Sequence, residues 1–214
     1  MSIRRLIRDR APLHVDWSGR IRCDICGHTG FPYRSTRYGE ATDHCFKCHS
    51  HRRKRELAWW VMLKAFPIRQ SARILEIAPG GQLSDMLKRR YRGYVGLRYP
   101  PYGAMSLPIE SESMDIVVSC DVIEHFKAPA FALREIHRVL KPGGVHLSAV
   151  LVDRDATYYA GGKVVGYHLD EDGGKCPVYT TLGRDLPDTV ASWIGAGCGS
   201  VTLLDGVLMI YKAE

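Results

Sequence analysis

Four cysteines in the first quarter of the chain have the spacing of a metal site. Cys23 and Cys26 form one C-x2-C pair, Cys45 and Cys48 form another, and 18 residues separate the two pairs. Each pair can present two thiolates on one tight turn, and two such turns complete a tetrahedral zinc site. A closed four-thiolate site leaves no position for a substrate, so the predicted role of the zinc is structural. Three neighbouring histidines are alternative ligands: His28, His44 and His49.

A second group of residues able to do chemistry is Asp121-x-x-Glu124-His125, which follows an apolar run. His125 is the candidate general base, because histidine titrates near neutral pH, and Glu124 is the acidic residue beside it. Two interpretations stay open. The carboxylates and the imidazole could hold Mg²⁺, or Glu124 could hydrogen-bond the following loop while His125 lines a pocket. The second is favoured, because Mg²⁺ demands near-ideal octahedral geometry.

Positive charge is concentrated in the same quarter as the cysteine pairs. Residues 1–56 contain 13 Lys/Arg and 6 Asp/Glu, whereas the remaining residues contain 17 of each. Aromatic residues alternate with this charge, a combination typical of nucleic-acid binding, so RNA or a ribonucleoprotein is a candidate partner. Arg52, Arg53 and Arg55 are the candidate phosphate contacts. A solvated basic surface over a small aromatic core is the alternative, and a protein partner also stays open.

Composition narrows the class of protein. The chain has 214 residues, of which 45% are hydrophobic and 25% charged, as in an ordinary folded protein of one or two domains. No stretch approaches 18 apolar residues, so neither a membrane-spanning helix nor membrane association is expected. Seven cysteines without a secretory signal indicate a reducing compartment, either the cytoplasm or an organellar matrix.

Strand and helix patterns alternate from residue 73 onward. Strands are predicted at 74–77, 94–97, 115–119 and 145–152, helices at 82–91, 128–140 and 186–194, and a hairpin at 201–211. A turn at 141–144 is predicted to end the helix at 128–140. A further helix is predicted at about 55–66. This alternation predicts an α/β fold, with helices on both faces of a parallel sheet and an antiparallel edge. Ligands of such folds bind at the carboxyl ends of the strands.

Three motifs appear in the order and spacing of a known family: Ile74-Leu-Glu-Ile-Ala-Pro-Gly80, Met114-Asp-Ile-Val-Val-Ser-Cys-Asp121 and Leu140-Lys-Pro-Gly-Gly144. On these residues the chain resembles class I S-adenosylmethionine (SAM)-dependent methyltransferases of the type 11 group, which have a Rossmann-like sheet. With its cysteine pairs it resembles a subgroup that carries an N-terminal zinc ribbon. The resemblance implies a basic zinc-ribbon module at 1–56 and a methyltransferase domain at 57–214. It also implies methyl transfer to an oxygen or nitrogen of RNA, a ribonucleoprotein, a saccharide or another small molecule.

The resemblance also implies the cofactor site. Glu76, Ala78, Gly80 and Gly81 would meet the methionine end of SAM, because glycines allow close approach to the backbone. Five further positions would complete the cofactor site: Arg98, Ser106, Leu107, Cys120 and Asp121. The Asp121-x-x-Glu124-His125 group is similar to the metal site of ubiquinone-pathway and small-RNA 2′-O-methyltransferases, although Asp121 is shorter than the Glu of those families. Tyr167 and His168, in a predicted polar loop after the strand at 145–152, are weaker candidates for the substrate side.

Two departures from the family pattern affect the nucleoside half of that site. Arg98 stands where the family has an acidic residue that binds the ribose, and only nine residues separate Leu97 from Leu107. We therefore expect a shortened third-strand region. These departures keep a second function open. In it the chain is a weak or inactive methyltransferase fold that acts as a scaffold, docked to an anionic partner through its basic ribbon.

Overall fold

The structure is a computed structural model that describes residues 20–31, 33–35, 42–65, 69–98, 106–169, 174–204 and 206–214. The basic residues before position 20 lie outside these ranges, as do residues 99–105 of the shortened connection. Within the described ranges, every helix is too short or too polar to span a bilayer.

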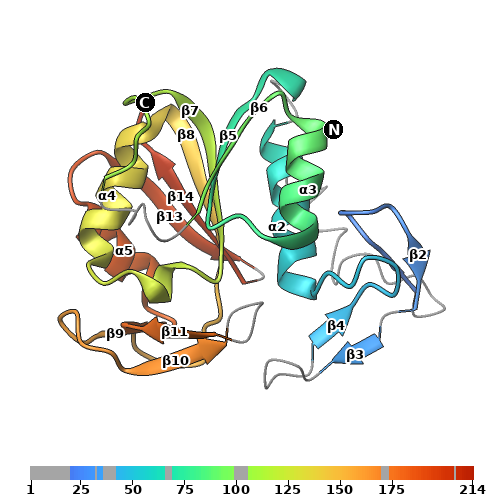
Figure 1. Cartoon of the computed structure of the whole chain (residues 1–214). Coiled ribbons are helices and arrows are strands. Elements are labelled where there is room, and N and C mark those ends of the chain that lie inside the picture. The colour runs from blue at the N-terminus through green and yellow to red at the C-terminus, as the bar shows by residue number, and fades with distance from the viewer. Residues whose placement is uncertain are drawn as a thin grey trace.

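A six-stranded sheet forms the centre of the molecule, with the strand order β13-β14-β8-β7-β5-β6 (Figure 1). Its strands are β5 (Arg73–Ile77), β6 (Gly93–Leu97), β7 (Met114–Cys120), β8 (Leu140–Ala149), β13 (Cys198–Leu204) and β14 (Val207–Lys212). Strands β5 to β8 are parallel, and β14 runs antiparallel to both β8 and β13. The prediction of a mostly parallel α/β sheet with an antiparallel edge is confirmed. The carboxyl ends of β5 to β8 meet at one side of the sheet, which we call the carboxyl edge.

Helices cover both faces of this sheet (Figure 1). On one face lie α2 (Arg52–Ala65) and α3 (Gly81–Arg90), and on the other lie α4 (Pro129–Val139) and α5 (Leu186–Ile194). Successive residues of a strand point to opposite faces, so Ile74 packs in the core under α2 and α3 while Leu75 packs in the core under α4 and α5. The strands are apolar on both sides because both sides are covered.

The connection between β6 and β7 is short. Its described residues, 98 and 106–113, form neither a helix nor a strand. The described sheet therefore ends at β6, in keeping with the shortened third-strand region that the sequence predicts.

The chain around residue 140 differs from the prediction. The sequence predicts a turn at 141–144 and a strand at 145–152, but α4 ends at Val139 and β8 runs from Leu140 to Ala149. Leu140 pairs with Met114, the register then shifts before Ile116, and Gly143 has a φ of 72°. This irregularity accommodates the glycine turn within the strand, so the turn does not delay the start of pairing.

Two small antiparallel hairpins precede the first helix. They pair β1 (Ile21–Arg22) with β2 (Thr29–Gly30), and β3 (Tyr33–Ser35) with β4 (Thr42–His44). Helix α2 begins at Arg52, three residues before the predicted start, and the Lys54 N–H donates to Nδ1 of His51 at 3.5 Å. This contact satisfies one of the N–H groups that every helix leaves unpaired in its first turn. The helix runs through residue 56, where the sequence analysis divides the chain.

A pair of short hairpins follows β8. They join β9 (Tyr158–Tyr159) to β12 (Thr180–Thr181), and β10 (Gly166–Leu169) to β11 (Lys175–Val178). The sequence treats this region as a polar loop, which is wrong for these residues. The hairpins reach the carboxyl edge, since Tyr179 N–H donates to the carbonyl of Glu124 at 2.9 Å. Two single turns complete the described elements: η1 (Arg69–Ser71) and η2 (Ile123–His125).

Candidate functional site

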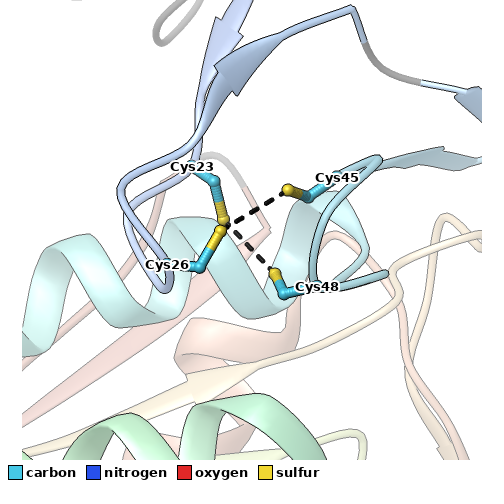
Figure 2. A group of neighbouring side chains, drawn as sticks. All are labelled: Cys23, Cys26, Cys45 and Cys48. Atoms are coloured by element: carbon cyan, nitrogen blue, oxygen red, sulfur yellow. Dashed lines mark hydrogen bonds between the residues drawn. The ribbon is translucent and has the colours of Figure 1, made fainter.

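The four cysteines of the two predicted pairs converge on one point (Figure 2). All four sulfurs lie within 4.8 Å of one another. Cys23 Sγ is 3.6 Å from Cys48 Sγ, and Cys26 Sγ is 3.7 Å from Cys45 Sγ. A tetrahedron with Zn–S bonds of about 2.3 Å has S–S edges of about 3.8 Å, so these separations suit Zn²⁺. The residues present therefore fit the metal that the spacing predicts.

Both cysteine turns share one backbone geometry. In the first, Gly27 N–H donates to Cys23 O at 2.8 Å, and in the second His49 N–H donates to Cys45 O at 2.8 Å. Gly27 and His49 have φ values of 72° and 59°. A left-handed residue after each pair is what lets both thiols face the same side. It suits glycine and is less usual for histidine.

Burial affects the protonation of two of these thiols. Burial raises the pKa of Cys26 to about 12 and raises the pKa of Cys23 as well. Such thiols stay protonated at neutral pH unless a cation stabilises the thiolates. Ser50 Oγ lies 3.1 Å from Cys48 Sγ and 3.5 Å from Cys23 Sγ, so it can donate to either sulfur.

The cysteine cluster packs directly on the rest of the molecule. Cys23 and Cys45 are each 1% exposed, and they belong to the same buried cluster as Leu57 and Trp60 of α2 and Ile74 of the sheet. Helix α2 therefore lies between the cysteine cluster and the sheet.

The turn from β5 into α3 has the backbone that a ligand loop requires. Ala78 and Gly81 have φ values of 55° and 65°, and Gly80 is the N-cap of α3. Ala78 N–H donates to Leu97 O at 2.8 Å, which holds the turn against the end of β6. A Cβ on Gly96 would lie 3.1 Å from Pro79 of the same turn. Gly96, which the sequence analysis missed, is therefore needed for this close approach.

Glu76 ties three elements together. Its carboxylate accepts a hydrogen bond from Ser84 Oγ of α3 at 3.0 Å and another from the Tyr94 hydroxyl of β6 at 2.7 Å. The side chain is buried, and burial raises its pKa while the two hydroxyl donors lower it. These contacts connect the end of β5 to α3 and β6, the two elements on either side of the turn.

Asp121 lies at the carboxyl edge beside the β5 turn, and its partner comes from another part of the chain. Its φ is 53°, and its N–H donates to Ala149 O at 3.0 Å. Arg53 Nε lies 3.2 Å from Asp121 Oδ1, and Arg53 Nη2 lies 3.5 Å from Oδ2. Cys120 Sγ is 3.5 Å from Oδ2 of the same carboxylate, and burial raises the pKa of this thiol. The sequence predicts a phosphate contact for Arg53, and no local pattern reveals this pair.

The other two arginines considered for phosphate contact also have partners within the chain. Arg52 pairs with Glu56 at 3.2 Å, and buried Arg55 donates to the carbonyl of Ser50.

Glu124 and His125 are neighbours in η2, and both contact the segment that includes β11: His125 through Pro177, and Glu124 through the N–H of Tyr179. Glu124 is 4% exposed, its Oε2 has no hydrogen-bond partner among the described residues, and burial and then Asp121 raise its pKa to about 8. His125 Nδ1 lies 2.7 Å from Pro177 O, and burial lowers the pKa of this imidazole. Nδ1 must donate to that carbonyl, so Nε2 of neutral His125 can accept a proton.

His168 completes this group. Its ring packs edge-on against His125 at 5.0 Å, and its Nδ1 lies 3.9 Å from Glu124 Oε1. Ligand atoms of Glu124, His125 and His168 all lie within 4.8 Å of one another, whereas Asp121 groups with His51 and Cys120. The sequence groups Asp121 with Glu124 and His125 as candidate Mg²⁺ ligands. In the structure, Asp121 belongs to a different group of ligand atoms from Glu124 and His125.

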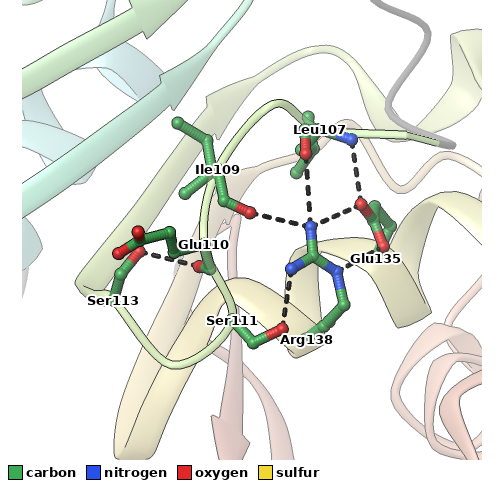
Figure 3. A network of polar contacts seen from close by, with 7 residues as sticks. All are labelled: Leu107, Ile109, Glu110, Ser111, Ser113, Glu135 and Arg138. Carbon is green, nitrogen blue, oxygen red and sulfur yellow. Dashed lines mark hydrogen bonds and ion pairs between the residues drawn. The ribbon is translucent and has the colours of Figure 1, made fainter.

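The remaining predicted cofactor residues lie on the β6–β7 connection. Arg98 and Ser106 are exposed, and Leu107 is buried. Leu107 N–H donates to Glu135 Oε1 at 2.9 Å, and its carbonyl accepts from Arg138 Nη2 at 3.2 Å (Figure 3). Two side chains of α4, Glu135 and Arg138, thus hold this segment in place. Local sequence patterns do not reveal this arrangement.

Part of the chain that contains these residues is similar to known methyltransferases. Residues 62–148 match the family model of a methyltransferase domain. This range begins in α2 and ends in β8, so it contains the β5 turn, Asp121 and the η2 pair. An uncharacterised methyltransferase of Schizosaccharomyces pombe is 37% identical over 75 residues, which are 35% of this chain and 28% of that protein. The chain thus matches little more than a quarter of that relative's length.

Solved structures show the same fold. The SAM-bound amino pentose methyltransferase CalS10 of Micromonospora echinaspora superposes with a TM-score of 0.52 at 14% identity, covering 76% of this chain and 92% of that one. DesVI of Streptomyces venezuelae gives 0.52 at 13% identity, with the same coverage. The sheet therefore has the Rossmann-like fold of these two proteins, which is the fold that the motifs predict.

Proposed function

We propose that the chain is a SAM-dependent methyltransferase with a structural zinc ion bound by its four cysteines. The observation that carries this proposal is the assembly of Glu76, the Ala78–Gly81 turn and Asp121 at the carboxyl edge, within the range that matches a methyltransferase domain. Ligands of parallel α/β sheets bind at this edge. The sulfonium of SAM is already activated, so the protein mainly has to bind and align the two reactants.

His125 is the proposed general base for an oxygen or nitrogen nucleophile. Burial lowers its pKa, so the ring is neutral at physiological pH, and Pro177 fixes the proton on Nδ1. Nε2 is then the atom that takes the proton from the oxygen or nitrogen that receives the methyl group. Glu124, whose pKa burial raises to about 8, is largely protonated at neutral pH and acts as a hydrogen-bond donor beside the base.

For the substrate, the basic N-terminal quarter favours RNA or a ribonucleoprotein that docks through residues 1–56. A saccharide or other small molecule is the alternative. CalS10, which has the same fold, acts on an amino pentose. This proposal includes the division of the chain at residue 56 into a zinc-ribbon module (1–56) and a methyltransferase domain (57–214).

The first experiment is calorimetric titration of the purified chain with SAM, with zinc measured on the same sample. We expect one zinc per chain and SAM binding in the range of about tens of micromolar, because Arg98 replaces a carboxylate that would accept ribose hydrogen bonds. Arg98→Asp should tighten binding by about tenfold or more. Arg92→Asp is the matched control, because this exposed arginine precedes β6 at the opposite end of the strand.

Two results would count against the proposal. If neither the natural chain nor Arg98→Asp binds SAM, the scaffold function is favoured over the enzyme. If the four thiols of the native protein react freely and metal analysis finds no zinc, the structural zinc is refuted.

A further inference from the structure

The ion pair between Arg53 and Asp121 joins two distant parts of the chain. Arg53 lies in the first turn of α2, just after the second cysteine pair, whereas Asp121 directly follows β7. Arg53 Nε and Asp121 Oδ1 are 3.2 Å apart, and the side chains are 24% and 28% exposed. Each side chain is partly exposed, although the facing atoms, Arg53 Nε and Asp121 Oδ1, are themselves buried.

The pair lies where the proposed cofactor would place its amino-acid end. Ile77 and Ser119 are register partners on the adjacent parallel strands β5 and β7. The next residues, Ala78 and Cys120, therefore stand side by side, and Asp121 follows beside the turn into α3. His51 and Cys120 also have ligand atoms within 4.8 Å of Asp121.

The charges of this pair match a zwitterion. The methionine end of SAM carries an α-carboxylate and an α-ammonium on one carbon. A guanidinium binds a carboxylate through a planar fork, and a carboxylate accepts from an ammonium. A zwitterion placed between Arg53 and Asp121 exchanges one ion pair for two and leaves no charge unpaired.

We infer that Arg53 and Asp121 together bind the amino-acid end of SAM, Arg53 through the carboxylate and Asp121 through the ammonium. This inference rests on the proposed function, because it names residues of the same cofactor site. It assigns to α2, which follows the cysteine cluster, a direct part in cofactor binding. The competing role is that of a latch, in which the pair only fastens α2 to β7.

Ligands that lack one charge or both separate these two roles. The natural chain, Arg53→Gln and Asp121→Asn are titrated with SAM, with decarboxylated SAM and with 5′-methylthioadenosine, which has neither charge. Arg52→Gln is the matched control, because Arg52 is the neighbouring arginine of the same helix turn and is 54% exposed. Thermal unfolding of each variant shows whether the fold is kept. Arg53→Lys, which keeps the charge without the fork, is the second variant at this position.

For Arg53→Gln we expect SAM affinity to fall about tenfold to a hundredfold, with little change for the other two ligands. Asp121→Asn should weaken SAM and decarboxylated SAM but not 5′-methylthioadenosine. Arg53→Lys should lie between the natural chain and Arg53→Gln for SAM, and Arg52→Gln should match the natural chain throughout.

Equal losses for all three ligands in Arg53→Gln would overturn the inference in favour of the latch. Unchanged SAM affinity in Arg53→Gln would overturn it too, while SAM binding by the natural chain would leave the proposed function standing. If the natural chain binds none of the three ligands, the proposed function and this inference fail together.

Discussion

Arg138 is the side chain that fixes the β6–β7 connection, and replacing it with lysine tests how that segment is held. Its guanidinium donates to Leu107 O at 3.2 Å, to Ile109 O at 2.9 Å and to Ser111 Oγ at 2.8 Å. It also forms a two-pronged pair with Glu135, at 2.7 and 2.8 Å (Figure 3). Arg138→Lys keeps the positive charge near Glu135 but removes the planar fork that reaches three acceptors at once.

The expected loss follows from these contacts. A protein hydrogen bond contributes a net of about 0.5–1.5 kcal/mol, and the Arg138 side chain is 36% exposed, so water can replace part of each bond. Three loop contacts at the lower end of this range amount to about 1–2 kcal/mol of unfolding free energy. For a chain of this length that corresponds to a decrease in Tm of roughly 2–8 °C.

The assay is urea unfolding at neutral pH, with thermal unfolding as a second measurement. Arg134→Lys is the control, because Arg134 lies one turn earlier on α4 and its Nε donates to Trp193 O at 2.7 Å. It should lose less than Arg138→Lys. Equal losses in the two variants would refute the reasoning. So would an Arg138→Ala variant no less stable than Arg138→Lys, because the retained Glu135 pair would then contribute nothing.

Three further predictions concern the metal, a carboxyl group and the backbone. Cys48→Ser should lower the zinc content, measured by atomic absorption, and expose α2 to amide hydrogen exchange, whereas unchanged zinc content would contradict the four-thiolate site. Because Glu124 has a folded pKa of about 8, well above its unfolded value, the folded chain holds its proton more tightly, and unfolding free energy is lost as pH rises from about 4.5 to 8. Glu124→Gln should remove this loss, worth a few kcal/mol at about 1.4 kcal/mol per pKa unit, whereas exposed Glu112→Gln should keep the natural pH profile in urea unfolding. Ala78→Gly should raise stability by about 1 kcal/mol in thermal unfolding, since alanine is strained at a φ of 55°, and a lower Tm would contradict this.

Features with a local cause could be predicted from the sequence. Helix α5 occupies 186–194 as predicted, because its apolar spacing and the proline at its first turn are local signals. The four sulfurs converge as the C-x2-C spacing predicts, because each turn is set by its own few residues. The parallel sheet follows from the alternation of apolar strands and amphipathic helices.

Features that depend on contacts between distant parts of the chain could not be predicted from the sequence. The contact of Arg53 with Asp121 spans 68 positions, and no local pattern distinguishes Arg53 from its basic neighbours Arg52 and Arg55. His168 reaches Glu124 because residues 166–178 form a hairpin, whereas their polar composition indicates a loop. Pairing of Leu140 with Met114 overrides the turn that the Lys-Pro-Gly-Gly run favours. In each case a tertiary contact decides between local alternatives.

Helix α2 makes the cysteine cluster and the carboxyl edge parts of one arrangement. Ser50 contacts the sulfurs of Cys23 and Cys48 through its hydroxyl, and its carbonyl accepts from both Cys45 N–H and the Arg55 guanidinium. Ser50 therefore connects the cysteine cluster directly to the first turn of α2. That first turn carries the side chain that contacts Asp121. A zinc ion bound by the cysteines would thus affect the proposed methyl transfer without touching either reactant, because it would hold in place the helix turn that meets the proposed cofactor.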